Sequence, residues 1–141
     1  MRVRRTEGDS VNDVDVGTLL SSHRWEDRLR AAELLHRCAD PSAVVMLRAL
    51  LEDDDGAVIG AAAPALLACG EGGWTAALEG VWNSDDTAQT EAIRGAFIDL
   101  VLQDQDVETV LSDHVARPRS DAAARGANEM LIALKLRPAA D

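Results

Sequence analysis

Few of the side chains that can do chemistry are spaced as a reaction or a bound metal would require. His23, His36 and His114 lie far apart, and none stands i, i+4 to a glutamate as in a helical zinc site. His36 is two residues from Cys38 and points to a different helix face, so we interpret it as a surface or groove histidine. No nucleophile elbow or Gly-rich phosphate loop accompanies the serines. The sequence therefore predicts no catalytic residue, no metal and no cofactor.

An acidic run at residues 52–56 invites comparison with a calcium loop. An EF-hand loop with Gly56 at its sixth position would begin at Leu51, whose side chain cannot bind calcium. We therefore reject a calcium site. Asp54 and Asp55 instead suit the start of a helix, where a carboxylate caps backbone N–H groups and meets the positive end of the dipole.

The two cysteines, Cys38 and Cys69, are too few for a disulfide scaffold and lack CxxC spacing. Both lie in apolar helical contexts, so we expect free, buried thiols in a reducing cytoplasm. Trp74 and Trp82 are eight residues apart on one helix face, which favours core packing over a ligand cage. We expect a cytoplasmic protein, because no apolar run reaches the roughly 18 residues of a membrane span and no apolar signal segment follows the N-terminal arginines.

The charge is strongly acidic and concentrated in the middle of the chain. The 141 residues include 14 Lys and Arg against 25 Asp and Glu, a net charge of −11. Between Glu52 and Asp113 there are 14 acidic residues and one basic residue, Arg94, so this segment carries 1 − 14 = −13. This disfavours nucleic acid as a partner, because phosphate binding needs clustered Lys and Arg. Two interpretations stay open: a charge that maintains solubility, and a surface that captures a basic protein.

Periodicity and composition predict an all-α chain. Ala, the best helix former, occurs 24 times, and no segment alternates with the period of a strand. Asp55, Asp86 and Ser120 stand at expected N-cap positions. The expected helices are 14–21, 24–38, 42–51, 56–69, 73–82, 87–102, 107–116 and 121–134.

The helices repeat in pairs. A shift of 31 residues places matching positions in register: Ala31 on Ala62 and Ile93, Leu35 on Leu66 and Phe97, Cys38 on Cys69 and Leu100, and 53–55 on 84–86. A further shift of about 34 residues brings 93–100 onto 127–134. Such a period is typical of a solenoid, in which each hairpin buries its apolar face on its neighbours. We predict a right-handed α-solenoid of about four hairpins at 13–40, 41–70, 71–103 and 104–136, forming one domain (13–137) between a flexible segment (1–12) and a tail (138–141).

The second hairpin resembles a HEAT repeat of the short bacterial type. The resemblance lies in the paired leucines and acidic turn of 50–56, Val58, the small residues of 61–62, Ala65-Leu66 and the closing Gly70. The first repeat departs from the pattern at Asp27, where a valine belongs, and the third has Gln89-Thr90 in place of Val-Arg. The Arg–Asp ladder of the family is therefore largely missing. The resemblance implies that partners bind the exposed face of the second helix of each pair.

Two surfaces are candidates for that binding. Asp53, Asp54, Asp85 and Asp86 occupy matching turns and should lie along one edge. A second set lies on the second helices: Arg94, and the row Leu67, Ile98 and Ile132. Whether this row faces solvent or fills space between helices stays open.

We expect a non-catalytic module that binds a basic protein, either as an immunity or inhibitor protein or as an adaptor, without nucleic-acid or membrane partners. The alternative is a HEAT-like enzyme, similar to DNA glycosylases or bilin lyases.

Overall fold

The computed structural model describes residues 2–3 and 14–136, with side chains from residue 15 onward. Over these residues the chain is helical, apart from a two-residue antiparallel pair of β1 (Arg2–Val3) with β2 (Val14–Asp15). The all-α prediction is confirmed. The helices are α1 (Val16–Leu20), α2 (Trp25–Cys38), α3 (Val44–Leu50), α4 (Gly56–Ala68), α5 (Glu71–Asn83), α6 (Thr87–Leu102), α7 (Val107–Ala116) and α8 (Asp121–Ala133), with a 3-10 turn, η2 (Pro41–Ala43), before α3.

The expected flexible segment and tail fall mostly outside the described residues. Of the segment 1–12, only Arg2 and Val3 are described, and they pair with β2. The whole of the expected tail, 138–141, is outside the described part of the chain.

The predicted N-caps are confirmed by their hydrogen bonds. The Oδ1 atom of Asp55 accepts from the backbone N–H of Ala57 at 2.9 Å, and Asp86 accepts in the same way from Ala88. Ser120 Oγ accepts from the backbone N–H of Ala123 at 3.0 Å. Because these acceptors satisfy N–H groups that have no partner within the helix, the starts of α4, α6 and α8 are set locally.

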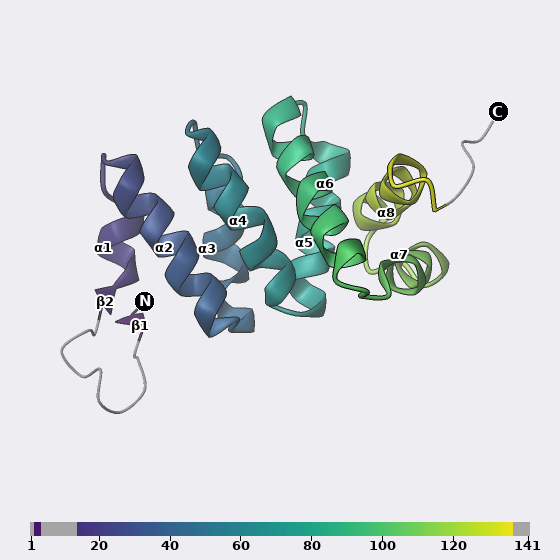
Figure 1. Ribbon diagram of the computed structural model, residues 1–141, viewed down its shortest axis with the longest axis horizontal. Coiled ribbons are helices and arrows are strands. Elements are labelled where there is room, and N and C mark those ends of the chain that lie inside the picture. Colours follow the sequence, from purple (N-terminus) through teal and green to yellow (C-terminus); the bar gives the residue numbers. More distant parts are fainter. Residues whose placement is uncertain (1, 4–13, 137–141) are drawn as a thin grey trace.

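The helices form two layers over most of the chain (Figure 1). α2, α4 and α6 lie side by side in the front layer, each packed on the next, and α3 and α5 lie behind them. α7 and α8 are seen end-on, turned away from the earlier helices. α8 packs chiefly on α5 and α7, not on α6, so the predicted alignment of α6 with α8 as neighbours in one row is wrong.

One set of apolar positions matched by the 31-residue shift lies in the core. Leu35, Leu66 and Phe97 are each fully buried, as the 31-residue register requires. Trp74 packs edge-on against Phe97, with ring centroids 5.1 Å apart. Trp82 does not join the core: it is 42% exposed, and the Arg125 guanidinium lies 5.1 Å from its ring centroid, on the side where α8 crosses α5.

The prediction that both cysteines are buried is wrong for Cys38. Cys38 is exposed, whereas Cys69 is buried and its Sγ lies 3.3 Å from the Ala65 carbonyl oxygen. Cys38 is the last residue of α2, and Ala39 then takes the left-handed conformation (φ 47°) that leads the chain away. Cys69 is covered by the first turn of α5, where a Cβ at Gly73 would lie 3.2 Å from the Cys69 Cβ.

Two glycines allow α5 to approach its neighbours closely. A Cβ at Gly73 would overlap the Leu66 carbonyl oxygen of α4, and a Cβ at Gly126 of α8 would overlap the Leu78 carbonyl oxygen of α5. Both obstacles are backbone atoms, which cannot rotate away as a side chain can. These contacts fix the separations of α5 from α4 and of α8 from α5.

Gly126→Ala should therefore destabilise the protein by about 1–3 kcal/mol or more, because the new methyl group must push α8 away from α5. Gly95→Ala is the matched control: Gly95 lies inside α6, and no atom lies within 4 Å of the place that its new methyl group would take. That change should be neutral or stabilise by up to about 1 kcal/mol. The free energy of unfolding in urea measures both, and equal effects would contradict the close approach.

Candidate functional site

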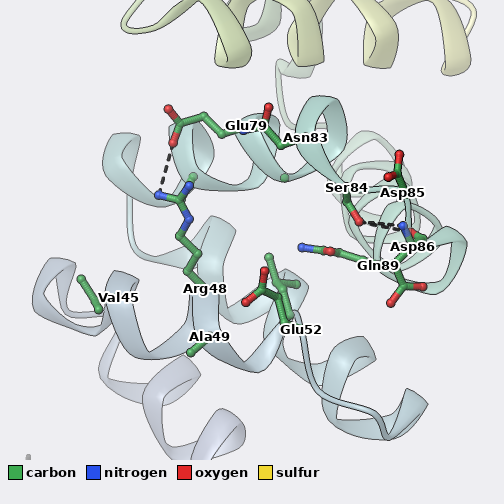
Figure 2. Close-up of a pocket in the computed structure, with 13 residues that line it drawn as sticks. Val45, Arg48, Ala49, Glu52, Glu79, Asn83, Ser84, Asp85, Asp86 and Gln89 are labelled. Carbon is green, nitrogen blue, oxygen red and sulfur yellow. Dashed lines mark hydrogen bonds and ion pairs between the residues drawn. The ribbon is translucent and has the colours of Figure 1, made fainter.

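A cavity of about 540 Å³ opens between α3, α5 and the turn that begins α6 (Figure 2). α3 and α5 supply two walls, and the α5–α6 turn supplies a third. Its polar lining consists of Arg48, Glu52, Glu79, Asn83, Ser84, Asp85, Asp86 and Gln89. Four carboxylates and one guanidinium line it, which gives a formal lining charge of 1 − 4 = −3.

Two of the four carboxylates already have structural roles. Glu79 Oε1 lies 3.4 Å from Arg48 Nη1, and Glu79 Oε2 accepts a hydrogen bond from Ser120 Oγ at 2.8 Å. Asp86 caps α6. In the described part of the chain, the carboxylates of Glu52 and Asp85 have no hydrogen-bond or ion-pair partner. Both residues are exposed and line the cavity.

Gln89 is the buried polar group of this site. It is 7% exposed and extends from the first turn of α6 into the cavity (Figure 2). Its amide nitrogen lies against Gly80 of α5, where a Cβ would be 3.4 Å away. Within the described residues its amide makes no hydrogen bond. Among the described residues, only His114 has fully enclosed side-chain nitrogen or oxygen atoms without a partner. The Gln89 amide is therefore accessible from the cavity and open to a hydrogen-bond partner there.

Gln89 is not among the site residues predicted above, although the sequence contains a signal for it. In the 31-residue register Gln89 occupies the position of Val58, which is fully buried in α4. The signal was a polar residue in place of the buried valine of the preceding hairpin, although the first hairpin has Asp27 there. Glu52 was likewise not among the predicted binding residues.

The predicted acidic residues divide between structure and surface. Asp53 is nearly buried and its carboxylate accepts from Arg28 Nε at 2.7 Å and Nη2 at 3.2 Å. Asp54 has a side chain that is 96% exposed, and its Oδ1 lies 3.5 Å from Arg28 Nη2. Burial would raise the pKa of Asp53, but hydrogen bonds from Arg28 and from the backbone N–H of Asp55 outweigh it and lower that pKa below its usual value. Asp53 therefore holds the α3–α4 turn on α2.

The predicted row on the second helices is not continuous. Leu67 is buried, and its carbonyl oxygen accepts a hydrogen bond from Trp74 Nε1 at 3.1 Å. Arg94 and Ile98 are exposed on one face of α6. Ile132 is half-buried on α8, which packs chiefly on α5 and α7. Leu67 lines a second cavity of about 410 Å³, together with His36, Pro64 and Leu100.

No protein-family model, curated protein or solved structure matches the chain. The arguments for function consequently rest on geometry and charge. Among the described residues, no group of three or more His, Cys, Asp or Glu side chains is arranged to hold a metal ion. None of the described helices combines the length and apolarity needed to cross a bilayer.

His114 is a second buried polar group, and it lines neither of the two cavities described above. It is 1% exposed on α7, and among the described residues neither ring nitrogen has a hydrogen-bond partner. Burial lowers its pKa, and the charge of Arg119 adds to this, against the opposing effects of Glu71 and Asp113. The folded protein therefore holds this imidazole neutral at pH values where an unfolded chain would protonate it.

Asp53→Asn should destabilise the protein by about 1–3 kcal/mol at pH 7, because the largely buried Arg28 guanidinium loses its closest carboxylate and keeps only the longer contact with Asp54, at 3.5 Å. Asp54→Asn, one residue on and almost fully exposed, should change stability by less than about 0.5 kcal/mol. The pKa of Asp53 is lower in the folded protein than in the unfolded chain. Its contribution to the free energy of unfolding is therefore fully present above the unfolded-state pKa, and it is lost as the pH falls through the folded-state pKa. Urea unfolding at pH 7 and pH 3 tests both statements, and equal losses in the two variants would contradict them.

His114→Leu should raise the free energy of unfolding by about 1–3 kcal/mol at pH 7, because it removes two unsatisfied buried nitrogens. The wild-type protein should lose stability as the pH falls below about 6.5, where the unfolded histidine takes up a proton that the folded one resists. The variant should lose less over that range. His23→Leu, at an exposed position, is the control. A variant with unchanged stability and an unchanged pH profile would show that His114 has partners in solution.

Proposed function

We propose that this protein is a non-catalytic module that binds a basic protein through the edge formed by the α3–α4 and α5–α6 turns. The observation that carries the proposal is the set of exposed carboxylates on these turns that neither cap a helix nor lie in a buried ion pair. Asp53, Asp55 and Asp86 are engaged in an ion pair or in caps. Glu52, Asp54 and Asp85 are exposed, and two of them open on the same cavity.

The arrangement of the helices supports a single acidic edge. The turns that precede α2, α4 and α6 lie at the same edge of the molecule, at the top of Figure 1. Charges gathered on one edge add their fields, which speeds association with an oppositely charged partner and excludes like-charged ones. A solubility charge has no need of such clustering.

We further infer that the architecture is a HEAT-like solenoid whose last hairpin is turned. The layer of α2, α4 and α6 supports this inference, as does the Arg28–Asp53 ion pair between successive hairpins. On the exposed face of α6, Arg94 and Ile98 would extend the binding surface beyond the acidic edge. An inhibitor of a cationic protein and an adaptor both fit this description.

The enzyme alternative gains less support from the structure. A glycosylase-like activity needs a basic groove for DNA, but no Arg or Lys lines either of the two cavities except Arg48, which is paired with Glu79. This distribution favours the protein-binding proposal.

The test begins with a partner captured from the native host and identified, whose association is then measured by surface plasmon resonance. The triple variant Glu52→Gln/Asp54→Asn/Asp85→Asn should slow association about tenfold at low salt, with little change in dissociation. The control triple Glu33→Gln/Glu108→Gln/Glu129→Gln removes the same charge from positions outside the cavity and should leave association nearly unchanged. If both triple variants slow association equally, the net charge of the whole surface matters and the acidic edge has no special role. An association rate that does not depend on salt concentration would also contradict the proposal.

A further inference from the structure

We propose that the cavity between α3, α5 and α6 is a receptor for one arginine side chain of the basic partner. In this proposal, which rests on the proposed function, the guanidinium reaches the Gln89 amide inside the cavity and is flanked by the carboxylates of Glu52 and Asp85. The acidic edge brings the partner in, and the cavity then holds one of its side chains.

Gln89 carries the proposal. Its side chain is more than nine-tenths buried, points into the cavity, and has no hydrogen-bond partner within the described residues (Figure 2). The equivalent position in the preceding hairpin is the apolar Val58. An apolar side chain would therefore suit the packing here, and the amide gains a role only if something in the cavity bonds to it.

The charge of the lining selects a cation. Arg48 is already paired with Glu79, and the start of α6 is capped by Asp86, so neither is free to attract an anion. The remaining carboxylates, Glu52 and Asp85, have no partner in the described part of the chain. A cationic group between them would be attracted by both charges and would hydrogen-bond to the amide oxygen of Gln89.

A guanidinium fits this arrangement better than an ammonium. Its five donors lie in a planar fork, so that it can bond to a carboxylate and to an amide oxygen at the same time. The lining also contains an apolar part, made of Val45, Ala49, Leu51 and Ala76. Such a wall suits the aliphatic stem of an arginine, which packs on apolar surface while the charged head reaches polar partners.

The first experiment titrates the labelled protein with N-acetyl-arginine amide and follows amide signals by NMR. The side-chain NH₂ signals of Gln89 should shift and saturate, with a Kd of about 1 mM, as expected for so small a ligand. The citrulline analogue has nearly the same shape without the charge and should cause no saturable shift. The lysine analogue should bind at least about fivefold more weakly.

Variants then test the assigned residues. Gln89→Leu keeps the volume and removes the unpartnered amide, so it should fold with at least wild-type stability while weakening arginine binding about tenfold. Glu91→Gln, exposed on the same helix and outside the cavity lining, is the control and should bind as the wild type does. Asp85→Asn, at an exposed position, should weaken binding severalfold and keeps the test valid if Gln89→Leu folds poorly.

Three results would overturn the receptor: no saturable shift at Gln89, equal binding of arginine and citrulline, or equal binding of arginine and lysine. Failure of the receptor can be told apart from failure of the proposed function. Suppose that the association of the captured partner depends on charge, but that it dissociates at the same rate from Gln89→Leu as from the wild type. This result would support the acidic edge and contradict the arginine receptor. Faster dissociation from Gln89→Leu, with association unchanged, supports the receptor.

Discussion

The close approach of α5 to α4 and α8 is the contact on which the rest of the structure depends. Gly73 and Gly126 each bring a helix against a carbonyl oxygen of its neighbour, at a separation that no side chain would permit. Two features follow from it. α5 covers Cys69, and α8 comes near enough for Ser120 to hydrogen-bond to Glu79, which forms part of the cavity lining. The packing of α8 on α5 thus stabilises the α5 wall of the candidate site.

The acidic residues serve two purposes that composition alone cannot separate. Some stabilise the fold: Asp55 and Asp86 cap helices, and Asp53 binds Arg28 across hairpins. These bonds hold the three carboxylates in place, so replacing them would also change the stability of the fold. Glu52 and Asp85, which have no hydrogen-bond or ion-pair partner among the described residues, lie on the same turns. A binding edge is therefore built from residues that neighbour the structural ones in sequence, and single-residue changes separate the two roles.

Two buried polar side chains, Gln89 and His114, lack partners among the described residues and differ in their surroundings. His114 has two enclosed ring nitrogens and lines neither of the two cavities described above, so its burial costs stability and makes that stability depend on pH. Gln89 faces an open cavity lined by carboxylates. A ligand in this cavity can form a hydrogen bond with Gln89 but not with His114. This difference makes Gln89, and not His114, the residue to test for recognition.

The sequence by itself determined the helices, because their signals are local: N-cap side chains such as Asp55 and Ser120 bond within one turn, and apolar spacing marks each buried face. It also identified Leu35, Leu66 and Phe97 as buried positions. Only the tertiary structure decided that α8 packs on α5, that Cys38 is exposed and that Trp82 leaves the core, because these depend on which helix covers which. For the same reason, only part of the candidate site could be predicted from the sequence. Asp85 was predicted from its position in a turn. That the Gln89 amide has no partner could not be predicted, because this depends on how α3, α5 and α6 pack around the cavity.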